Sequence, residues 1–447
     1  MSLTARLRQD ALMNRVLLNS AHLFSSNSIS LVLSFIQGIL AARLLGLADY
    51  GLLVIVMAYA STVNGLLSFR MSELVVRYGG EYLEQGEKEK AGALIKMAGI
   101  SEAVVSVLAF LLVALTAGIA TRLITKEPGT EWMIVLFAVG LLANFNAETS
   151  TGILQITDKI RIRGVVNLLQ TILSVSIIGI AFLMKQNGAA LNNALLIALL
   201  AYLLGKSVLG LGLFTAAQLQ LRHVLGSGWT RSSFAVLHSL RELFRFAFSS
   251  NLSATAILIF RESEILWVGF FLNQEAAALY KTAYTIVSLL SVPADPLILA
   301  VYPELNRLVV QQAWPNLRKF LRSVTAISFA YNALFAAVLV VLGPFILSLY
   351  GKQYIAAYPT MLTLLAGMAF NYTLFWNRPM LLSLGLPTFP LWATLFAGLV
   401  KLGLSFPLVP RYGIVMEAAL LSFYYVLSVG LIVWHGLREL RRRERAA

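Results

Sequence analysis

The chain has no cysteine, so disulfide bonds and thiolate metal sites are excluded. Charged residues are also scarce, because Asp, Glu, Lys and Arg make up only 13% of the 447 residues, whereas soluble domains carry about 25%. Hydrophobic residues, by contrast, account for 58% of the chain. This composition excludes an ordinary soluble domain and indicates a protein that lies within a lipid bilayer.

Long apolar runs recur along the chain. Each is about 20 residues long, which is the length that a helix needs to cross the hydrocarbon core of a bilayer. The alternating segments of about ten residues that build a membrane β-barrel do not occur. We therefore predict an all-α integral membrane protein with twelve transmembrane helices. The predicted spans are 16–41, 47–69, 93–119, 132–154, 164–184, 191–221, 246–272, 276–302, 323–349, 358–383, 387–408 and 412–436.

Lysine and arginine are unevenly shared between alternate connections. If the N-terminus lies inside, the inside connections and tails hold 23 of the 35 Lys and Arg residues and the outside connections hold 6. Basic connections stay in the cytoplasm, so both termini are predicted to be cytoplasmic. The net charge of +14 then reflects membrane topology and attraction to anionic lipid headgroups, and no nucleic-acid partner is expected.

One long connection near the middle of the chain separates six predicted spans from the other six. Both halves then have the same orientation, which predicts a pseudo-two-fold axis along the membrane normal. A weak repeat supports the division, since Tyr50 and Tyr280 each precede a basic connection at the same spacing. We predict an N-terminal six-helix lobe at 1–221, a cytoplasmic linker at 222–245, and a C-terminal six-helix lobe with a basic tail at 246–447.

Signatures of catalysis are missing. The four histidines are isolated in the sequence, without the spacing of metal ligands. The stretch LLGKS at 203–207 lacks the earlier glycine of a phosphate-binding loop and lies in a predicted span. The predicted outside connections are too short to form a catalytic domain. We therefore expect a transporter and not an enzyme, with no cofactor and no metal site.

Charges interrupt the seventh predicted span, ILIFRESEILWVGFFL, at Arg261, Glu262 and Glu264. A charge at the centre of a membrane helix costs about 2.5–3.5 kcal/mol on insertion scales, so each one needs a partner or a function. At about 100° per residue, Arg261 and Glu264 share a helical face and Glu262 lies on another. The two are either lumen groups or a neutral structural pair. Glu148, within NFNAETST of the fourth span, is a further deep carboxylate.

A polar stripe runs along the first predicted span. Asn19, Ser26, Ser30 and Gln37 recur at intervals of seven, four and seven residues, which places them on one helical face. This spacing predicts a face that lines water-filled space. The alternative is that these side chains form hydrogen bonds to neighbouring helices, as such residues often do in membranes.

The stretch LAARLLGLADYGLL resembles the RxLGxxxYG signature of polysaccharide exporters of the O-antigen flippase (Wzx) type, in the multidrug/oligosaccharidyl-lipid/polysaccharide (MOP) exporter superfamily. The matching positions are Arg43, Leu45, Gly46, Tyr50 and Gly51. Further stretches similar to this family are ESEILWVGFFL, AALYKTAYTI followed by VYPELNRL, and LVPRYGIVMEAAL. The resemblance therefore covers both halves of the chain.

This resemblance implies a V-shaped pair of six-helix lobes that opens alternately to each side of the bacterial cytoplasmic (inner) membrane. It implies a flippase that moves an isoprenoid-diphosphate-linked glycan from the cytoplasmic to the outer leaflet, for cell-surface polysaccharide synthesis with other polysaccharide-assembly proteins. A guanidinium group binds phosphate oxygens bidentately, so Arg43, Arg70 and Arg261 are the candidate substrate-binding cations. The polar stripe of the first span supplies further lumen candidates.

Two other functions remain open. A drug antiporter of the same superfamily would exchange H⁺ or Na⁺ for a small organic molecule, and Glu148, Glu262 and Glu264 are the candidate ion-coupling residues. A sugar permease also has six-plus-six topology, although RYGGEYLEQGEKEKAG lacks the GxLxDRxGRR pattern of that class. The sequence departs from the exporter family where Met416 and Glu417 replace the usual Gly-Ala, so packing near the twelfth span is expected to differ.

Overall fold

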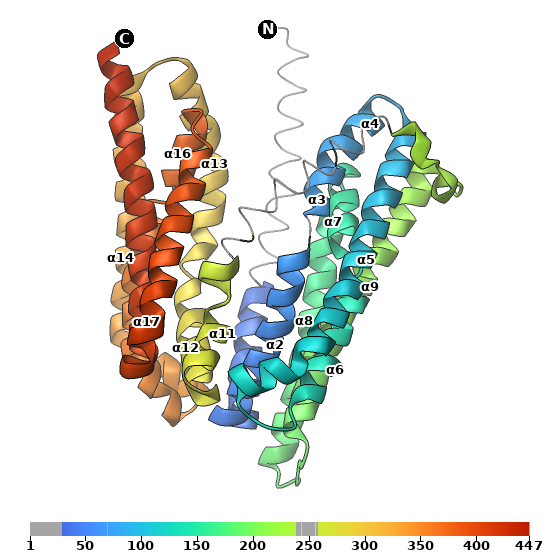
Figure 1. Ribbon diagram of the computed structural model, residues 1–447, viewed down its shortest axis with the longest axis vertical. Coiled ribbons are helices and arrows are strands. Elements are labelled where there is room, and N and C mark those ends of the chain that lie inside the picture. The colour runs from blue at the N-terminus through green and yellow to red at the C-terminus, as the bar shows by residue number, and fades with distance from the viewer. Residues whose placement is uncertain (1–28, 69, 238–242, 244–254, 256–257, 447) are drawn as a thin grey trace. The chain divides into compact units, whose positions relative to one another are not determined.

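The computed structural model describes residues 29–68, 70–237, 243, 255 and 258–446, which form helices joined by short connections and no β-strand (Figure 1). Packing divides the chain into two units. The first comprises 1–45, 59–122 and 127–255, and the second comprises 46–58, 123–126 and 256–447. The predicted lobe boundaries at 221 and 246 stay a prediction.

The first unit is built from α-helices, a π-helix and two 3₁₀ turns. These elements are the helix Ile29–Leu45, α3 (Met71–Leu74), a π-helix (Val75–Gly79), α4 (Gly80–Glu84), α5 (Lys88–Ala120), α6 (Glu131–Ala143), α7 (Ala147–Ile156), α8 (Arg161–Gln186), α9 (Ala194–Leu225) and two short 3₁₀ turns at Trp229–Arg231 and Phe234–Val236. A buried core joins α3, α5, α7 and α9 through residues such as Leu74, Leu94 and Ile153.

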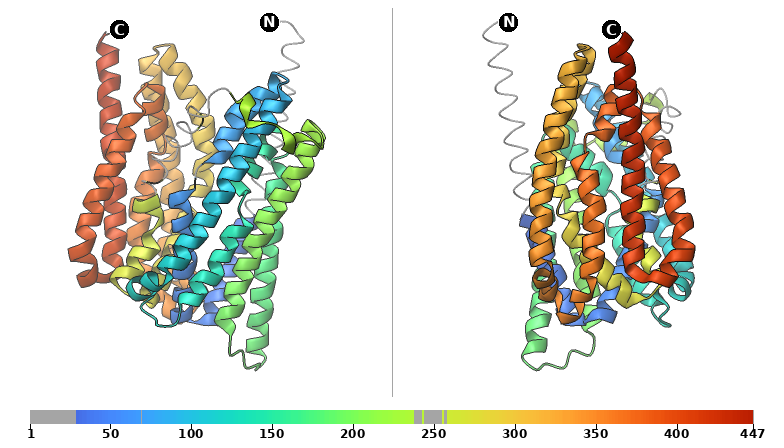
Figure 2. Two further views of the ribbon diagram at one scale, coloured as in Figure 1. Left: turned by 45° about the vertical axis from the view of Figure 1, so that its right-hand side comes forward. Right: turned by 90° about the vertical axis from the view of Figure 1, so that its left-hand side faces the viewer.

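The second unit takes the first part of α2 (Leu47–Leu67) and the remainder of the described chain. Its helices are α11 (Glu264–Phe271), α12 (Gln274–Ser288), α13 (Ser291–Val310), α14 (Trp314–Tyr350), α15 (Tyr358–Thr373), α16 (Asn377–Ser383) and α17 (Thr388–Ala446), with a π-helix at Leu258–Glu262 and a 3₁₀ segment at Lys352–Ala357. Gly413 breaks α17, and its two arms lie side by side (Figures 1 and 2).

The described helices overlap each of the twelve predicted spans. Among the residues that the structure describes, seven helical segments are long and apolar enough to cross a membrane by themselves. One of these, α17, holds both the eleventh and the twelfth predicted spans. The eighth and tenth spans are each split into two shorter helices, while the first and seventh extend into residues outside the described ranges. Side chains such as Leu115 and Val341 are 81% and 74% exposed, as expected of helices that face lipid.

The glycines of the signature at 43–51 have separate physical roles. Gly46 has a φ of +83° in the joint between the helix Ile29–Leu45 and α2, a conformation that favours glycine. Tyr50 is buried and packs edge-on against Tyr354, with ring centroids 6.2 Å apart. At Gly51 a Cβ atom would overlap the backbone carbonyl group of Gln274. Gly46 is therefore explained by its backbone conformation and Gly51 by close packing inside the second unit.

Gly51→Ala is expected to lower the thermal unfolding midpoint of the purified protein. The added methyl group meets a backbone that cannot rotate away, and such overpacking costs about 1–3 kcal/mol. The matched control is Gly118→Ala on α5, where a Cβ would meet nothing within 4 Å. A Gly51→Ala midpoint equal to that of the control would contradict the close approach of α2 to α12.

Candidate functional site

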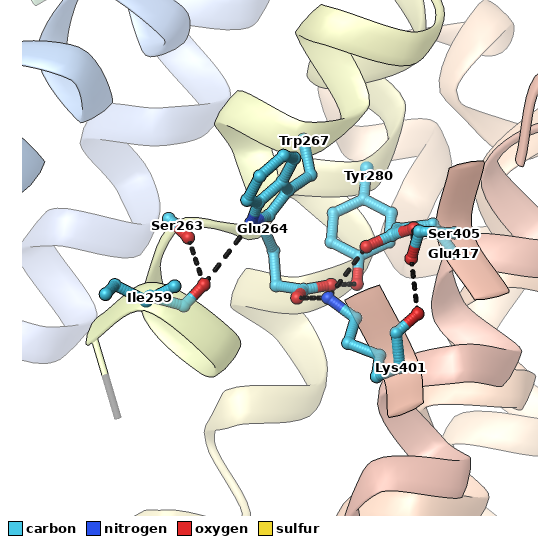
Figure 3. A network of polar contacts seen from close by, with 8 residues as sticks. All are labelled: Ile259, Ser263, Glu264, Trp267, Tyr280, Lys401, Ser405 and Glu417. Atoms are coloured by element: carbon cyan, nitrogen blue, oxygen red, sulfur yellow. Dashed lines mark hydrogen bonds and ion pairs between the residues drawn. The ribbon is translucent and has the colours of Figure 1, made fainter. Parts of the chain in front are cut away.

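A cluster of three buried charges lies in the second unit. Glu264 begins α11, and Lys401 and Glu417 lie on the two arms of α17 (Figure 3). The Lys401 ammonium group forms ion pairs with both carboxylates, and its Nζ lies 2.8 Å from Glu417 Oε1. The three side chains are at most 3% exposed. One ammonium group therefore bridges two carboxylates out of contact with solvent.

Two hydroxyl groups complete the cluster. The Tyr280 hydroxyl on α12 donates to Glu264 Oε2 at 2.6 Å, and the Ser405 Oγ on α17 donates to Glu417 Oε2 at 3.2 Å. Tyr280 is 0% exposed, so its hydrogen bond replaces solvent for a carboxylate that would otherwise be costly to bury. Side chains from α12 and α17 thus hold the two acids in place.

Local structure aims Glu264 at this cluster. The chain changes from the π-helix at Leu258–Glu262 to α11 at Ser263. The Ser263 Oγ and the Trp267 Nε1 both donate to the carbonyl oxygen of Ile259, at 2.6 and 3.3 Å (Figure 3). These bonds fasten the irregular turn to the start of the helix, and the first helical side chain then points towards α12 and α17.

The charge balance of the cluster leaves room for a proton. With every group ionised, Glu264, Lys401 and Glu417 sum to a charge of −1. An uncompensated charge inside a membrane protein is expensive, and a proton on either carboxylate would neutralise the cluster. The ammonium group occupies the position between the acids that a metal cation would need, so the arrangement favours a proton over Na⁺.

Arg261 lies in a different environment from Glu264. Its Nη2 donates to the Tyr372 hydroxyl at 3.5 Å, and its guanidinium carbon lies 5.7 Å from the ring centroid of Tyr425. Tyr284 and Tyr424 are the other nearby phenols. Within the described ranges no carboxylate forms an ion pair with Arg261, and its Nε is buried without a hydrogen-bond partner there. The alternative of a neutral Arg261–Glu264 pair was wrong, because Lys401 is the counter-ion of Glu264.

The other predicted substrate-binding residues belong to the first unit, whereas Arg261 belongs to the second. Arg43 is exposed, and Arg70 is an exposed residue whose Nη1 lies 2.7 Å from Glu73 Oε1. Ser30 and Gln37 are 4% and 5% exposed, and their Oγ and Nε2 atoms have no hydrogen-bond partner among the described residues. Asn19 and Ser26 lie outside the described residues. The binding roles of all six stay predictions.

The remaining predicted acids differ from one another. Glu148 lies in the first turn of α7 and accepts a hydrogen bond from the Ser72 Oγ at 2.5 Å. Its backbone N–H donates to Glu102 Oε1 at 2.8 Å, and that of Thr149 donates to Glu102 Oε2 at 2.9 Å. Glu102 therefore caps α7, a role not predicted from the sequence. Glu262 is exposed, in contrast to the adjacent buried cluster.

Ionisable side chains buried in membrane helices are costly and commonly mark functional sites. Comparison with known proteins specifies the class. A family model described as polysaccharide biosynthesis protein matches residues 16–309, which is more than half of the chain. The chain therefore belongs to the polysaccharide biosynthesis protein family.

Individual relatives agree with this assignment. The inner membrane protein YghQ of Escherichia coli K12 is 24% identical over 354 residues, which are 78% of this chain and 96% of that protein. An inward-facing structure of a MATE-family multidrug resistance transporter of the MOP superfamily is 16% identical, with a TM-score of 0.71 over 94% of this chain and 96% of that one. A MOP-superfamily transporter from Pyrococcus furiosus is 14% identical, with a TM-score of 0.57 over 96% of each chain. These structural likenesses establish the fold.

Proposed function

We propose that this protein is a lipid-linked oligosaccharide flippase of the bacterial inner membrane. It moves an isoprenoid-diphosphate-linked glycan from the cytoplasmic to the outer leaflet for cell-surface polysaccharide synthesis. The observation that carries the proposal is Arg261, a cation surrounded by tyrosines and paired with no carboxylate among the described residues.

The surroundings of Arg261 suit an anion better than a cation. Phenol groups leave the charge of the guanidinium group uncancelled, which is costly at membrane depth unless a ligand supplies negative charge. A diphosphate does so, and the planar guanidinium group matches its oxygens bidentately. The hydroxyls of Tyr372 and Tyr425 add donors and acceptors for sugar hydroxyls. An organic cation would instead be repelled.

The proposal can be tested in cells by depleting the protein. Lipid-linked glycan is then expected to accumulate on the cytoplasmic leaflet while polysaccharide disappears from the cell surface. Susceptibility to cationic drugs is measured in the same cells, because the alternative of a drug antiporter predicts that it rises. A rise in drug susceptibility with unchanged surface polysaccharide would overturn the flippase in favour of the antiporter.

The cluster of Glu264, Lys401 and Glu417 is the proposed coupling site. Its net charge of −1 lets it take up and release one H⁺ per transport cycle. The Lys401 ammonium group between the two carboxylates disfavours the binding of Na⁺. The membrane potential already favours outward movement of a diphosphate by about 2.3 kcal/mol per uncompensated charge at 100 mV. A proton that moves inward would add a second driving force.

Glu264→Gln is therefore expected to remove the response of transport to an imposed pH gradient more completely than it removes substrate binding. The side chain keeps its shape but no longer exchanges a proton. Transport and binding are both measured in proteoliposomes at zero potential. A sodium gradient at constant pH serves as the control and should have no effect on the wild type. Equal wild-type transport with and without a pH gradient would contradict the coupling.

The proposed direction of transport requires cytoplasmic termini. A reporter fused after Ala447 is expected to show cytoplasmic location, and one inserted in the connection at 125–131 is expected to show periplasmic location, because the basic connections lie on the opposite side. Both are measured with paired alkaline phosphatase and fluorescent protein fusions. Signals from the same side would contradict the topology.

A further inference from the structure

A groove in the second unit lies away from the charge cluster. It has a volume of about 560 Å³ and is lined by α14, by the junction of α15 and α16, and by the second arm of α17. Its floor is fixed, because the buried Trp376 donates from Nε1 to the Thr325 Oγ1 at 2.8 Å. The groove is therefore a formed feature of the unit and separate from the residues that surround Glu264 and Arg261.

One end of the groove is strongly basic. Arg318 and Arg322 lie one turn apart on α14, and Arg441 lies opposite on α17. The Arg318 Nη2 donates to Glu444 Oε2 at 2.5 Å, which fixes that guanidinium group. Arg322 and Arg441 are exposed and form no salt bridge within the described part of the chain. Three guanidinium groups thus share one carboxylate, and this end carries an excess of positive charge.

The other end of the groove is apolar. Phe329 on α14 and Leu437 and Val433 on α17 line it, and Phe329 is 63% exposed. Ile327 on α14 and Trp434 on α17 are further exposed apolar side chains of the same two helices, at 62% and 57% exposure. In a membrane protein such surface faces acyl chains, so the apolar end is open to the hydrocarbon of the bilayer.

The length of the groove fits one leaflet. Eleven residues separate Arg318 from Phe329 on α14, which is about 16 Å at 1.5 Å per residue. Half of the hydrocarbon core is about 15 Å thick. A ligand with an anionic head at the arginines would therefore extend its apolar part along the groove to the middle of the bilayer.

We propose that this groove binds an anionic glycerophospholipid, with its phosphate group against Arg322 and Arg441 and one acyl chain against Phe329 and Leu437. Basic pockets between transmembrane helices are suited to anionic headgroups. A free phosphate ion would make no use of the apolar end, and a neutral lipid would make no use of the arginines. The site is independent of the proposed transport substrate, since Arg261 and the charge cluster take no part in it.

Native mass spectrometry of the full-length protein tests the proposal. Protein released from nanodiscs with equal phosphatidylglycerol and phosphatidylcholine should retain phosphatidylglycerol preferentially. Arg322→Gln with Arg441→Gln is expected to reduce this preference about tenfold or more, because each basic residue near the surface adds attraction to an anionic lipid. The matched control is Lys319→Gln with Arg442→Gln, which removes the same charge from the same two helices but from residues outside the lining of the groove.

Three results would overturn the lipid site. No preference for phosphatidylglycerol in the wild type would show that the groove does not select an anionic lipid. An equal loss in the control pair would show a general effect of charge. Displacement of the lipid by inorganic phosphate alone would show a simple anion site. The thermal unfolding midpoint of each variant is also measured in lipid-free detergent. A lost preference for phosphatidylglycerol supports the site only when this midpoint equals that of the wild type.

Discussion

Replacing Lys401 with methionine is expected to remove most of the folded protein from the membrane. The substitution leaves Glu264 and Glu417 buried without their shared counter-ion. Loss of one partner from a buried ion pair costs about 3–5 kcal/mol, because the remaining charge stays uncompensated. This is a large part of the total stability of a folded protein, which is about 5–15 kcal/mol. Abundance in the membrane fraction and thermal unfolding in detergent measure the effect.

Two further variants separate the charge effect from lost packing. Lys206→Met removes another deep lysine, whose Nζ donates to the Ser61 Oγ at 3.3 Å and forms no salt bridge in the described part of the chain, so it should cost much less. Adding Glu264→Gln and Glu417→Gln to Lys401→Met makes the cluster neutral and should restore much of the abundance. Equal abundance of Lys401→Met and Lys206→Met would contradict the proposed role of the ion pairs.

Arg261→Ala is expected to abolish export of the lipid-linked glycan while the protein remains abundant in the membrane. No carboxylate among the described residues depends on Arg261 for neutralisation, so its loss strands no charge. Its loss from a diphosphate complex should weaken substrate binding by about 2–5 kcal/mol. Substrate binding by the purified protein and surface polysaccharide in cells are the two measurements.

Arg261→Lys is the matched control for this position. It keeps the positive charge but loses the planar donor fork, so binding should be weakened by less than in Arg261→Ala. The double substitution Arg261→Glu with Glu264→Arg is expected to lower protein abundance in the membrane. An arginine at position 264 would lie beside Lys401 and remove its ion pair with the carboxylate. Loss of protein abundance in step with activity in Arg261→Ala would instead support a structural role.

The fold was largely predictable because lipid imposes a simple rule on sequence. A helix that crosses hydrocarbon needs a long apolar run, and twelve such runs each correspond to described helices. The ends of the helices were predicted less accurately. The span predicted at 323–349 corresponds to α14, which already starts at Trp314. The span predicted at 276–302 corresponds to α12 and α13, and α13 continues to Val310. Leu317 and Leu321 are buried, so helical packing continues past the point where average hydrophobicity falls.

The candidate site was predictable in part. The cost of charge in a membrane singled out Arg261, Glu262 and Glu264 as residues that need a partner or a function. Of these, Glu264 lies in the buried cluster and Glu262 is exposed. The pairing of Arg261 with Glu264 was wrong because the angular argument assumed a regular α-helix, whereas Arg261 lies in a π-helix and Ser263 breaks the helix before Glu264. The true partner, Lys401, is 137 residues away from Glu264. A single sequence contains no information that brings such distant positions together.

Two features of the sequence did point towards the missed residues. Glu417 stands where the exporter family has a small residue, and its charge requires a local cation. Lys401 is a deep lysine on the other arm of the same helical hairpin. The departure from the family pattern therefore marks a position where this chain adds a carboxylate to the cluster. The charge of Glu417 is compensated by Lys401, which explains why a glutamate is tolerated there.

The central claim is tested most directly by transport in proteoliposomes. Wild-type protein is reconstituted with a labelled isoprenoid-diphosphate-linked oligosaccharide, and a membrane-impermeant probe measures the label that reaches the opposite leaflet. A labelled organic cation is measured in parallel, with Arg261→Ala as the matched control. We expect the wild type to move the glycan lipid well above protein-free vesicles, Arg261→Ala to return it to that background, and neither protein to move the cation. Movement of the cation without movement of the glycan lipid would contradict the flippase.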